Sequence, residues 1–107
     1  MPTAPYQTSA PERAAVDALP GATVLEFGTD WCGFCQAAQP VIATALAGKA
    51  PLRHLKFEDG PGRPLGRSYR VKLWPTLILL KDGQEVQRFV RPGDAAELAA
   101  ALAQLTA

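Results

Sequence analysis

Trp31-Cys32-Gly33-Phe34-Cys35 contains both cysteines of this 107-residue chain. The segment follows a strand-like apolar run, Ala22 to Phe27, and opens an alanine-rich run with helical character, Phe34 to Ala47. Two thiols at positions i and i+3 in the first turn of a helix are close enough to form a disulfide. The start of a helix also lowers the pKa of the first thiol. The segment therefore predicts a dithiol redox centre, with a static disulfide or two buried thiols as the alternative.

The composition is that of an ordinary globular protein, with 48% hydrophobic residues, 20% charged residues and a net charge of +1. This charge gives no reason to expect nucleic acid or an anionic membrane as a partner. No apolar run approaches the roughly 20 residues of a membrane span, and the N-terminus lacks the basic and apolar regions of a secretory signal. We therefore expect one domain, residues 1–107, in the cytoplasm, where a close cysteine pair is more often catalytic or metal-binding than structural.

The residue pattern predicts an α/β fold with a central mixed sheet and helices on both faces. Residues 1–10 read as an irregular arm or a short edge strand, and a first helix is expected from an N-cap at Ser9, with Ala15, Val16 and Leu19 facing inward. The other expected elements are strand 22–27, helix 34–47 with Pro40 inside it, strand 52–57, a short helix ending at 69, strands 76–80 and 85–90, and helix 94–105. The first two strands should be parallel, because a helix connects them, and the last two should form an antiparallel hairpin around Asp82-Gly83.

From about Pro11 onward the chain resembles the thioredoxin family. Val24-Leu25-Glu26-Phe27 followed by the dithiol segment is similar to the family's strand, acidic residue and Trp-Cys-Gly-x-Cys motif. Trp74-Pro75-Thr76 resembles the cis-proline segment that faces the cysteines in that family, and Lys81-Asp82-Gly83 matches its hairpin turn. The resemblance implies a thioredoxin fold and thiol-disulfide exchange.

Within this resemblance the two cysteines have different expected roles. Cys32 would attack a substrate disulfide to form a mixed disulfide, and Cys35 would resolve it by attacking Cys32. Gly33 and Phe34, which we expect to contact substrate, stand where thioredoxins usually carry Gly-Pro. A residue other than proline restores a backbone donor near the thiolates, so we expect a more oxidising dithiol than a Gly-Pro version.

Glu26 is the one acid in its apolar strand, six residues before Cys32, where the family usually has a buried aspartate. Burial should raise its pKa and make it a candidate catalytic proton acceptor for Cys35. The alternative is a carboxylate at the end of the strand that reaches solvent. His54, the only histidine, lies near where the family often has a lysine, and reads either as an ordinary strand residue or as a modulator of Glu26.

Four further residues are expected to bind substrate. Pro75 should have a cis bond to Trp74, which would leave the Trp74 backbone free to pair with an extended substrate strand; the alternative is a trans proline that begins a strand. Trp74 is bulkier than the family's usual residue and could narrow substrate choice. Trp31 either flanks the site or packs in the ordinary way. Gly93 resembles the glycine turn that completes the family's substrate groove, here beside the bulkier and charged Arg91.

Other function classes remain as alternatives. A zinc module is disfavoured, because structural zinc needs about four ligands and two cysteines with one distant histidine fall short. A glutathione-linked enzyme is possible by fold, and an oxidase or isomerase would need an oxidising compartment. A non-catalytic binding module would be expected to lose a cysteine. The favoured interpretation is a monomeric reductase of protein disulfides that uses no metal or organic cofactor and is recharged by a separate reductase.

Overall fold

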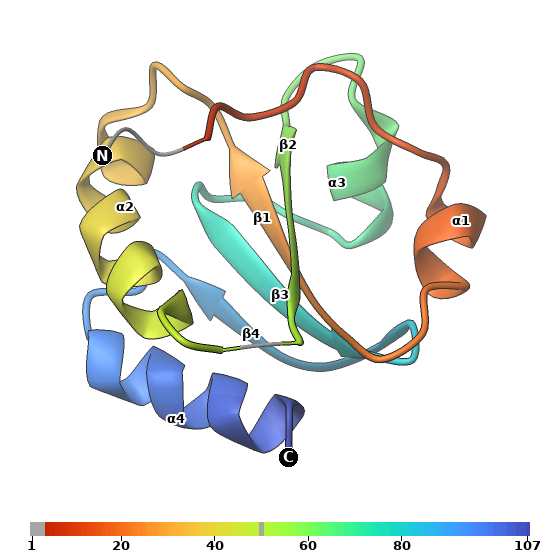
Figure 1. The fold of residues 1–107 in the computed structure, drawn as a ribbon. Coiled ribbons are helices and arrows are strands. Elements are labelled where there is room, and N and C mark those ends of the chain that lie inside the picture. Colours follow the sequence, from red (N-terminus) through yellow and green to blue (C-terminus); the bar gives the residue numbers. More distant parts are fainter. Residues whose placement is uncertain (1–3, 50) are drawn as a thin grey trace.

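The structure is a computed structural model that describes residues 4–49 and 51–107 (Figure 1). Its elements in chain order are α1 (Arg13–Asp17), β1 (Ala22–Gly28), α2 (Gly33–Leu46), β2 (Arg53–Glu58), α3 (Pro64–Ser68), β3 (Thr76–Lys81), β4 (Gln84–Val90) and α4 (Ala95–Leu105). The sheet has the order β2-β1-β3-β4, with β1 and β2 parallel and the other two pairs antiparallel. The predicted mixed sheet with a C-terminal hairpin is therefore confirmed.

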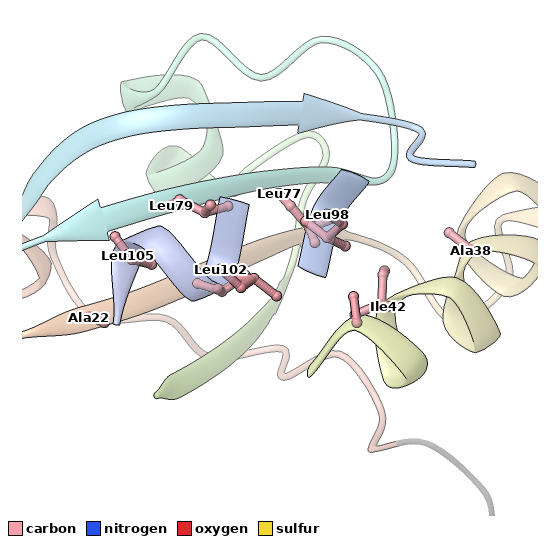
Figure 2. Packing of buried hydrophobic residues seen from close by; sticks show 10 residues of the cluster. Ala22, Ala38, Ile42, Leu77, Leu79, Leu98, Leu102 and Leu105 are labelled. Carbon is pink, nitrogen blue, oxygen red and sulfur yellow. The ribbon is translucent and has the colours of Figure 1, made fainter. Parts of the chain in front are cut away.

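Helices cover both faces of the sheet, with α2 and α4 on one side and α1 and α3 on the other (Figure 1). Because side chains alternate along a strand, Val24 and Leu77 join the core under α2 and α4, whereas Leu25 and Ile78 join the core under α1 and α3. Figure 2 shows the first of these cores, where α4 supplies leucines to the sheet. The same alternation places Glu26 on the side of the sheet that α2 covers, and the dithiol lies at the start of α2.

The N-terminal arm is fixed to the edge of the sheet. Gln7 forms a parallel bridge with Phe57, in which its N–H donates to the Lys56 carbonyl at 2.9 Å and its carbonyl accepts from the Glu58 N–H at 2.8 Å. This pairing holds the neighbouring side chain of Tyr6 inside the molecule, where it is 5% exposed. The arm thus brings an aromatic hydroxyl to the end of β1.

The first helix differs from the prediction. It begins at Arg13 after the N-cap Glu12, and Ser9 lies exposed in the arm. Of the three residues expected to face inward only Val16 is fully buried, and Ala15 is exposed. A helix of five residues is little more than one turn, so it can bury only a narrow face.

The C-terminal half matches its prediction closely. Asp82 and Gly83 both have positive φ, 51° and 82°, as a tight hairpin turn requires. The Asp94 carboxylate accepts hydrogen bonds from the Ala96 and Glu97 N–H groups at 2.9 and 3.2 Å and so caps α4. Within the described residues, no helix is long and apolar enough to cross a bilayer.

Candidate active site

The dithiol lies at the start of α2, directly beyond the carboxyl end of β1. Cys32 is the N-cap residue, and its sulfur accepts a hydrogen bond from the Cys35 N–H at 3.3 Å. Both side chains are free thiols. Cys32 is partly exposed whereas Cys35 is 1% exposed, so only the first sulfur is open to a substrate.

The two thiols also differ in their electrostatic surroundings. Burial alone would raise the pKa of Cys32. The Cys35 thiol, the backbone N–H groups of Cys35 and Phe34, and the nearby charge of Arg91 outweigh burial, so that the pKa of Cys32 lies below its ordinary value. For Cys35, burial and the contact with Cys32 raise the pKa to about 11. Cys32 is therefore suited to attack as a thiolate, while Cys35 holds its proton near neutral pH.

We expect alkylation to distinguish these thiols. When the reduced protein reacts with iodoacetamide across a pH series, Cys32 should be modified first, with a midpoint below the roughly 8.5 of a free cysteine, because thiolate forms at lower pH when the pKa is lowered. Cys35 should remain unmodified at neutral pH, since it is buried and protonated. Mass spectrometry of the two alkylated positions measures both rates. Equal labelling, or a Cys32 midpoint above that of a free thiol, would contradict the assignment.

An aromatic surface surrounds the exposed sulfur. Trp31 and Phe34 are 71% and 59% exposed, so Trp31 flanks the site and is not packed in the core. The Trp31 and Trp74 rings meet edge to face with centroids 5.9 Å apart, and the Arg91 guanidinium lies 3.7 Å from the centroid of the Phe34 ring. These side chains come from three separate segments of the chain and form one apolar and cationic border around Cys32.

The proline segment is formed in part as expected. The Trp74-Pro75 bond is cis. The Trp74 carbonyl is not free, however, because it accepts a hydrogen bond from Arg91 Nε at 2.8 Å, while the Arg91 N–H donates to the Pro75 carbonyl at 2.9 Å. A substrate strand would have to displace the Arg91 side chain to pair with that carbonyl. The Trp74 indole is held from its other end, since its N–H donates to Asp59 at 2.9 Å.

The two glycines expected to contact substrate both have open space beside them. Gly33 lies in the first turn of α2, and a Cβ added there would meet no atom within 4 Å. The same holds for Gly93, which is exposed in the loop after β4. Their substrate contacts stay predictions, and it is Arg91 of that loop that reaches the dithiol border.

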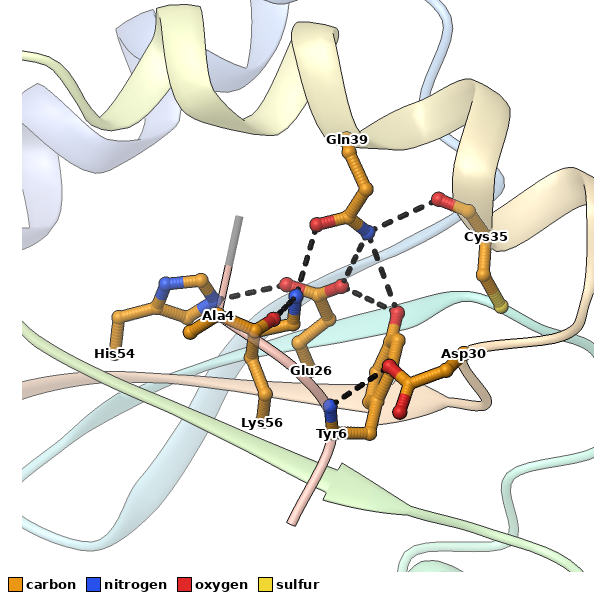
Figure 3. Close-up of polar contacts among 8 residues, drawn as sticks. All are labelled: Ala4, Tyr6, Glu26, Asp30, Cys35, Gln39, His54 and Lys56. Carbon is orange, nitrogen blue, oxygen red and sulfur yellow. Dashed lines mark hydrogen bonds and ion pairs between the residues drawn. The ribbon is translucent and has the colours of Figure 1, made fainter. Parts of the chain in front are cut away.

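Glu26 is fully buried in a polar cluster behind Cys35 (Figure 3). Its Oε2 accepts hydrogen bonds from the Tyr6 hydroxyl and from Gln39 Nε2, the latter at 2.9 Å, and its Oε1 lies 2.8 Å from His54 Nε2. Lys56 Nζ donates to Gln39 Oε1 at 2.9 Å. The alternative of a carboxylate that reaches solvent is therefore wrong.

The expected direction of the Glu26 pKa is also wrong. Burial does raise it, but the hydrogen bonds from His54, Tyr6 and Gln39 and the charge of Lys56 outweigh burial, so the pKa lies below its ordinary value. Because Glu26 is ionised at neutral pH, it is available as a proton acceptor. His54 contacts the carboxylate, as the modulator hypothesis requires.

Three members of this cluster were not predicted from the sequence. Tyr6 lies in a segment without periodicity, and Gln39 is a polar residue within a helix that is otherwise rich in apolar residues. Lys56 is two residues after His54 on the same strand, so both side chains point to the side of the sheet that carries Glu26. Strand alternation alone could have indicated Lys56, because residues two apart share a face. No local signal indicated Tyr6, whose neighbours in space are 20 or more residues away.

Comparison with known proteins agrees with this geometry. The thioredoxin family model matches residues 8–104. The chain belongs to the thioredoxin family. Thioredoxins are thiol-disulfide oxidoreductases, and the exposed and buried thiols of this thioredoxin-family protein fit that activity. Within the described residues, no group of three or more His, Cys, Asp or Glu side chains is arranged to hold a metal ion.

Individual thioredoxins show how far the similarity extends. The reduced form of thioredoxin 2 from Pseudomonas aeruginosa PAO1 superposes with a TM-score of 0.86 at 54% identity, over 96% of this chain and 95% of that one. A thioredoxin of Chlamydia trachomatis is 40% identical over 86 residues, which are 78% of this chain and 82% of the relative. A mutant thioredoxin of Halobacterium salinarum gives a TM-score of 0.76 at 29% identity, over 95% and 89% of the two chains.

Proposed function

We propose that this thioredoxin-family protein reduces disulfide bonds in protein clients through Cys32 and Cys35. The Cys32 thiolate attacks one sulfur of the client disulfide, and the other client sulfur leaves as a thiolate. Cys35 then attacks the Cys32 sulfur, which releases the second client thiol and leaves a Cys32–Cys35 disulfide. Because two electrons have passed to the client, a separate reductase has to return two electrons to the pair before the next cycle.

The observation that carries this proposal is the asymmetry of the thiol pair. Cys32 is accessible and has a lowered pKa, whereas Cys35 is buried with a pKa of about 11. The first is arranged to attack a partner and the second to react only with Cys32. The exposed rings of Trp31 and Phe34 add an apolar surface, which favours a polypeptide client over a small polar one.

The experiment that tests the proposal has two parts. The reduced protein should reduce the disulfides of insulin, and the Cys32/Cys35 couple should have a potential near the roughly −270 mV of thioredoxin when titrated in defined thiol buffers. The two tryptophans serve as the fluorescence reporter. A potential nearer −120 to −180 mV would contradict reduction and assign the protein to disulfide formation or isomerisation.

Phe34 should tune this potential through its backbone. The backbone N–H of Phe34 contributes to the lowered pKa of Cys32, and proline at this position has no N–H. Phe34→Pro should therefore lower the potential by about 20–30 mV, since one hydrogen bond is worth about 1 kcal/mol and about 30 mV corresponds to about 1.4 kcal/mol. Phe34→Ala keeps the donor while it removes the ring, and is the matched control. An unchanged or higher potential in Phe34→Pro would exclude the backbone effect.

The partners of the proposed activity follow from its chemistry. The protein would act as a monomer on disulfide-containing proteins and accept electrons from a reductase. It would work in a compartment that keeps thiols reduced, such as the cytoplasm, because an oxidising compartment would leave the pair as a disulfide.

A further inference from the structure

The second step of the proposed cycle needs a path for a proton. Cys35 cannot attack Cys32 while its sulfur keeps its proton, and the thiol is buried with a raised pKa. Glu26 is the one fully buried carboxylate among the described residues, but it forms no direct hydrogen bond with the Cys35 sulfur among its contacts. A group between the two side chains would solve this problem.

The Tyr6 hydroxyl occupies that position. It donates a hydrogen bond to Glu26 Oε2, and in Figure 3 it lies between the carboxylate and the Cys35 side chain. Gly28 locates both groups independently, because a Cβ built there would lie 2.5 Å from Cys35 Sγ and 2.8 Å from the Tyr6 hydroxyl oxygen. The sulfur and the hydroxyl thus share the small space left by a glycine without a side chain.

Contacts from three directions fix the Tyr6 side chain. Its backbone N–H donates to Asp30 Oδ1 at 3.0 Å, and the next residue of the arm is paired with β2. Lys56 Nζ lies 4.6 Å from the centroid of the ring, and Gln39 Nε2 is 3.5 Å from the hydroxyl oxygen. An edge tyrosine that only filled space would not need these polar contacts, and they hold the hydroxyl in place before the reaction.

We propose that Tyr6 relays the proton from Cys35 to Glu26 when the mixed disulfide is resolved, an inference that rests on the proposed exchange cycle. As the Cys35 sulfur forms its bond to Cys32 Sγ, its proton passes to the Tyr6 oxygen. The Tyr6 proton passes to Glu26 Oε2, and the client sulfur leaves Cys32 with the electron pair of the broken bond. Tyr6 ends neutral and Glu26 ends protonated, so no free Cys35 thiolate has to form. His54, partly exposed and beside Oε1, lies between Glu26 and solvent.

The test is Tyr6→Phe, which keeps the ring and removes the hydroxyl. In stopped-flow reaction with Ellman's reagent, attack by Cys32 releases one coloured thiolate at a rate that depends on reagent concentration, and resolution by Cys35 releases a second at a rate that does not. We expect Tyr6→Phe to slow resolution at least about tenfold, which is part of the roughly 10²–10⁴-fold that acid–base assistance contributes, and to leave attack unchanged. When Tyr6→Phe is added to a Glu26→Gln variant, resolution should slow by less than about twofold further. The reason is that both substitutions interrupt the same proton path, so their effects should not be independent.

Tyr69→Phe is the matched control. Tyr69 is as buried as Tyr6, and its hydroxyl has no hydrogen-bond partner among the described residues, so its removal should change neither phase. Thermal unfolding of each variant shows whether the fold is retained.

Two results would overturn the relay. One is a wild-type resolution rate in Tyr6→Phe, and the other is a double variant in which resolution slows by the product of the two single-variant factors. Because Ellman's reagent is a small disulfide, this assay tests the relay independently of any activity on proteins. A failure to reduce insulin would overturn the proposed function and would leave the result of this assay valid.

Discussion

Replacing Cys35 by serine should leave the protein covalently attached to its client. Cys32 keeps its exposure, and the backbone N–H at position 35 still stabilises its thiolate, so attack on a client disulfide should proceed. A serine hydroxyl does not resolve the mixed disulfide, because exchange requires a sulfur nucleophile. Turnover of insulin should fall to background while a protein–client adduct accumulates. Non-reducing electrophoresis and intact mass spectrometry measure that adduct, which should disappear when dithiothreitol is added.

The matched control for this result is Cys32→Ser. It removes the accessible sulfur and leaves the buried one, so it should lose turnover without forming an adduct. An equal yield of adduct from both variants would contradict the assignment of Cys32 as the attacking thiol. Adduct from Cys32→Ser alone would reverse the two roles.

The fold could be predicted because its signals are local. The apolar runs of β1 and β3, the Asp82-Gly83 turn and the Asp94 cap each depend on a few neighbouring residues, and the structure has all of them. The first helix was misplaced at its start because Ser9 is a good cap in isolation. In the structure the residues around Ser9 belong to an arm that is held by strand pairing at Gln7, a contact with residues about 50 positions away. A non-local contact of this kind leaves no periodic pattern in the sequence.

The same distinction explains what was missed at the candidate site. Cys32, Cys35 and the cis bond at Pro75 follow from short motifs, and Glu26 follows from one acid in an apolar strand. The direction of its pKa does not follow, because burial alone raises it and the outcome depends on donors from the arm, α2 and β2. Arg91 likewise reaches the site from the loop after β4. Its backbone has positive φ, 52°, and its guanidinium lies over the Phe34 ring and beside the Trp74 carbonyl, contacts that no local pattern in the sequence indicates.

Gly28→Ala should both destabilise the protein and slow its second chemical step. Gly28 is not in the left-handed region, so alanine is free to adopt its backbone conformation, and the cost arises from contact alone. The new methyl group would lie 2.5 Å from Cys35 Sγ and 2.9 Å from Tyr6 Cζ, distances that force at least one side chain to move. Overpacking of this kind costs about 1–3 kcal/mol, or a fall in Tm of roughly 4–20 °C for a domain of this size. Resolution by Cys35 should slow at least as much as in Tyr6→Phe, because the sulfur and the hydroxyl are pushed apart.

Gly33→Ala separates this steric effect from a general effect of added methyl groups. A Cβ at Gly33 meets nothing within 4 Å and lies in the first turn of α2, where alanine favours helix. Its Tm should therefore equal or exceed that of the wild type, and calorimetry of both variants gives the comparison. If Gly28→Ala is as stable as Gly33→Ala, the close approach of Cys35 and Tyr6 at the end of β1 is wrong. If Gly28→Ala is destabilised but resolves mixed disulfides at the wild-type rate, the contact supports only the fold, and the proton reaches Glu26 by another path.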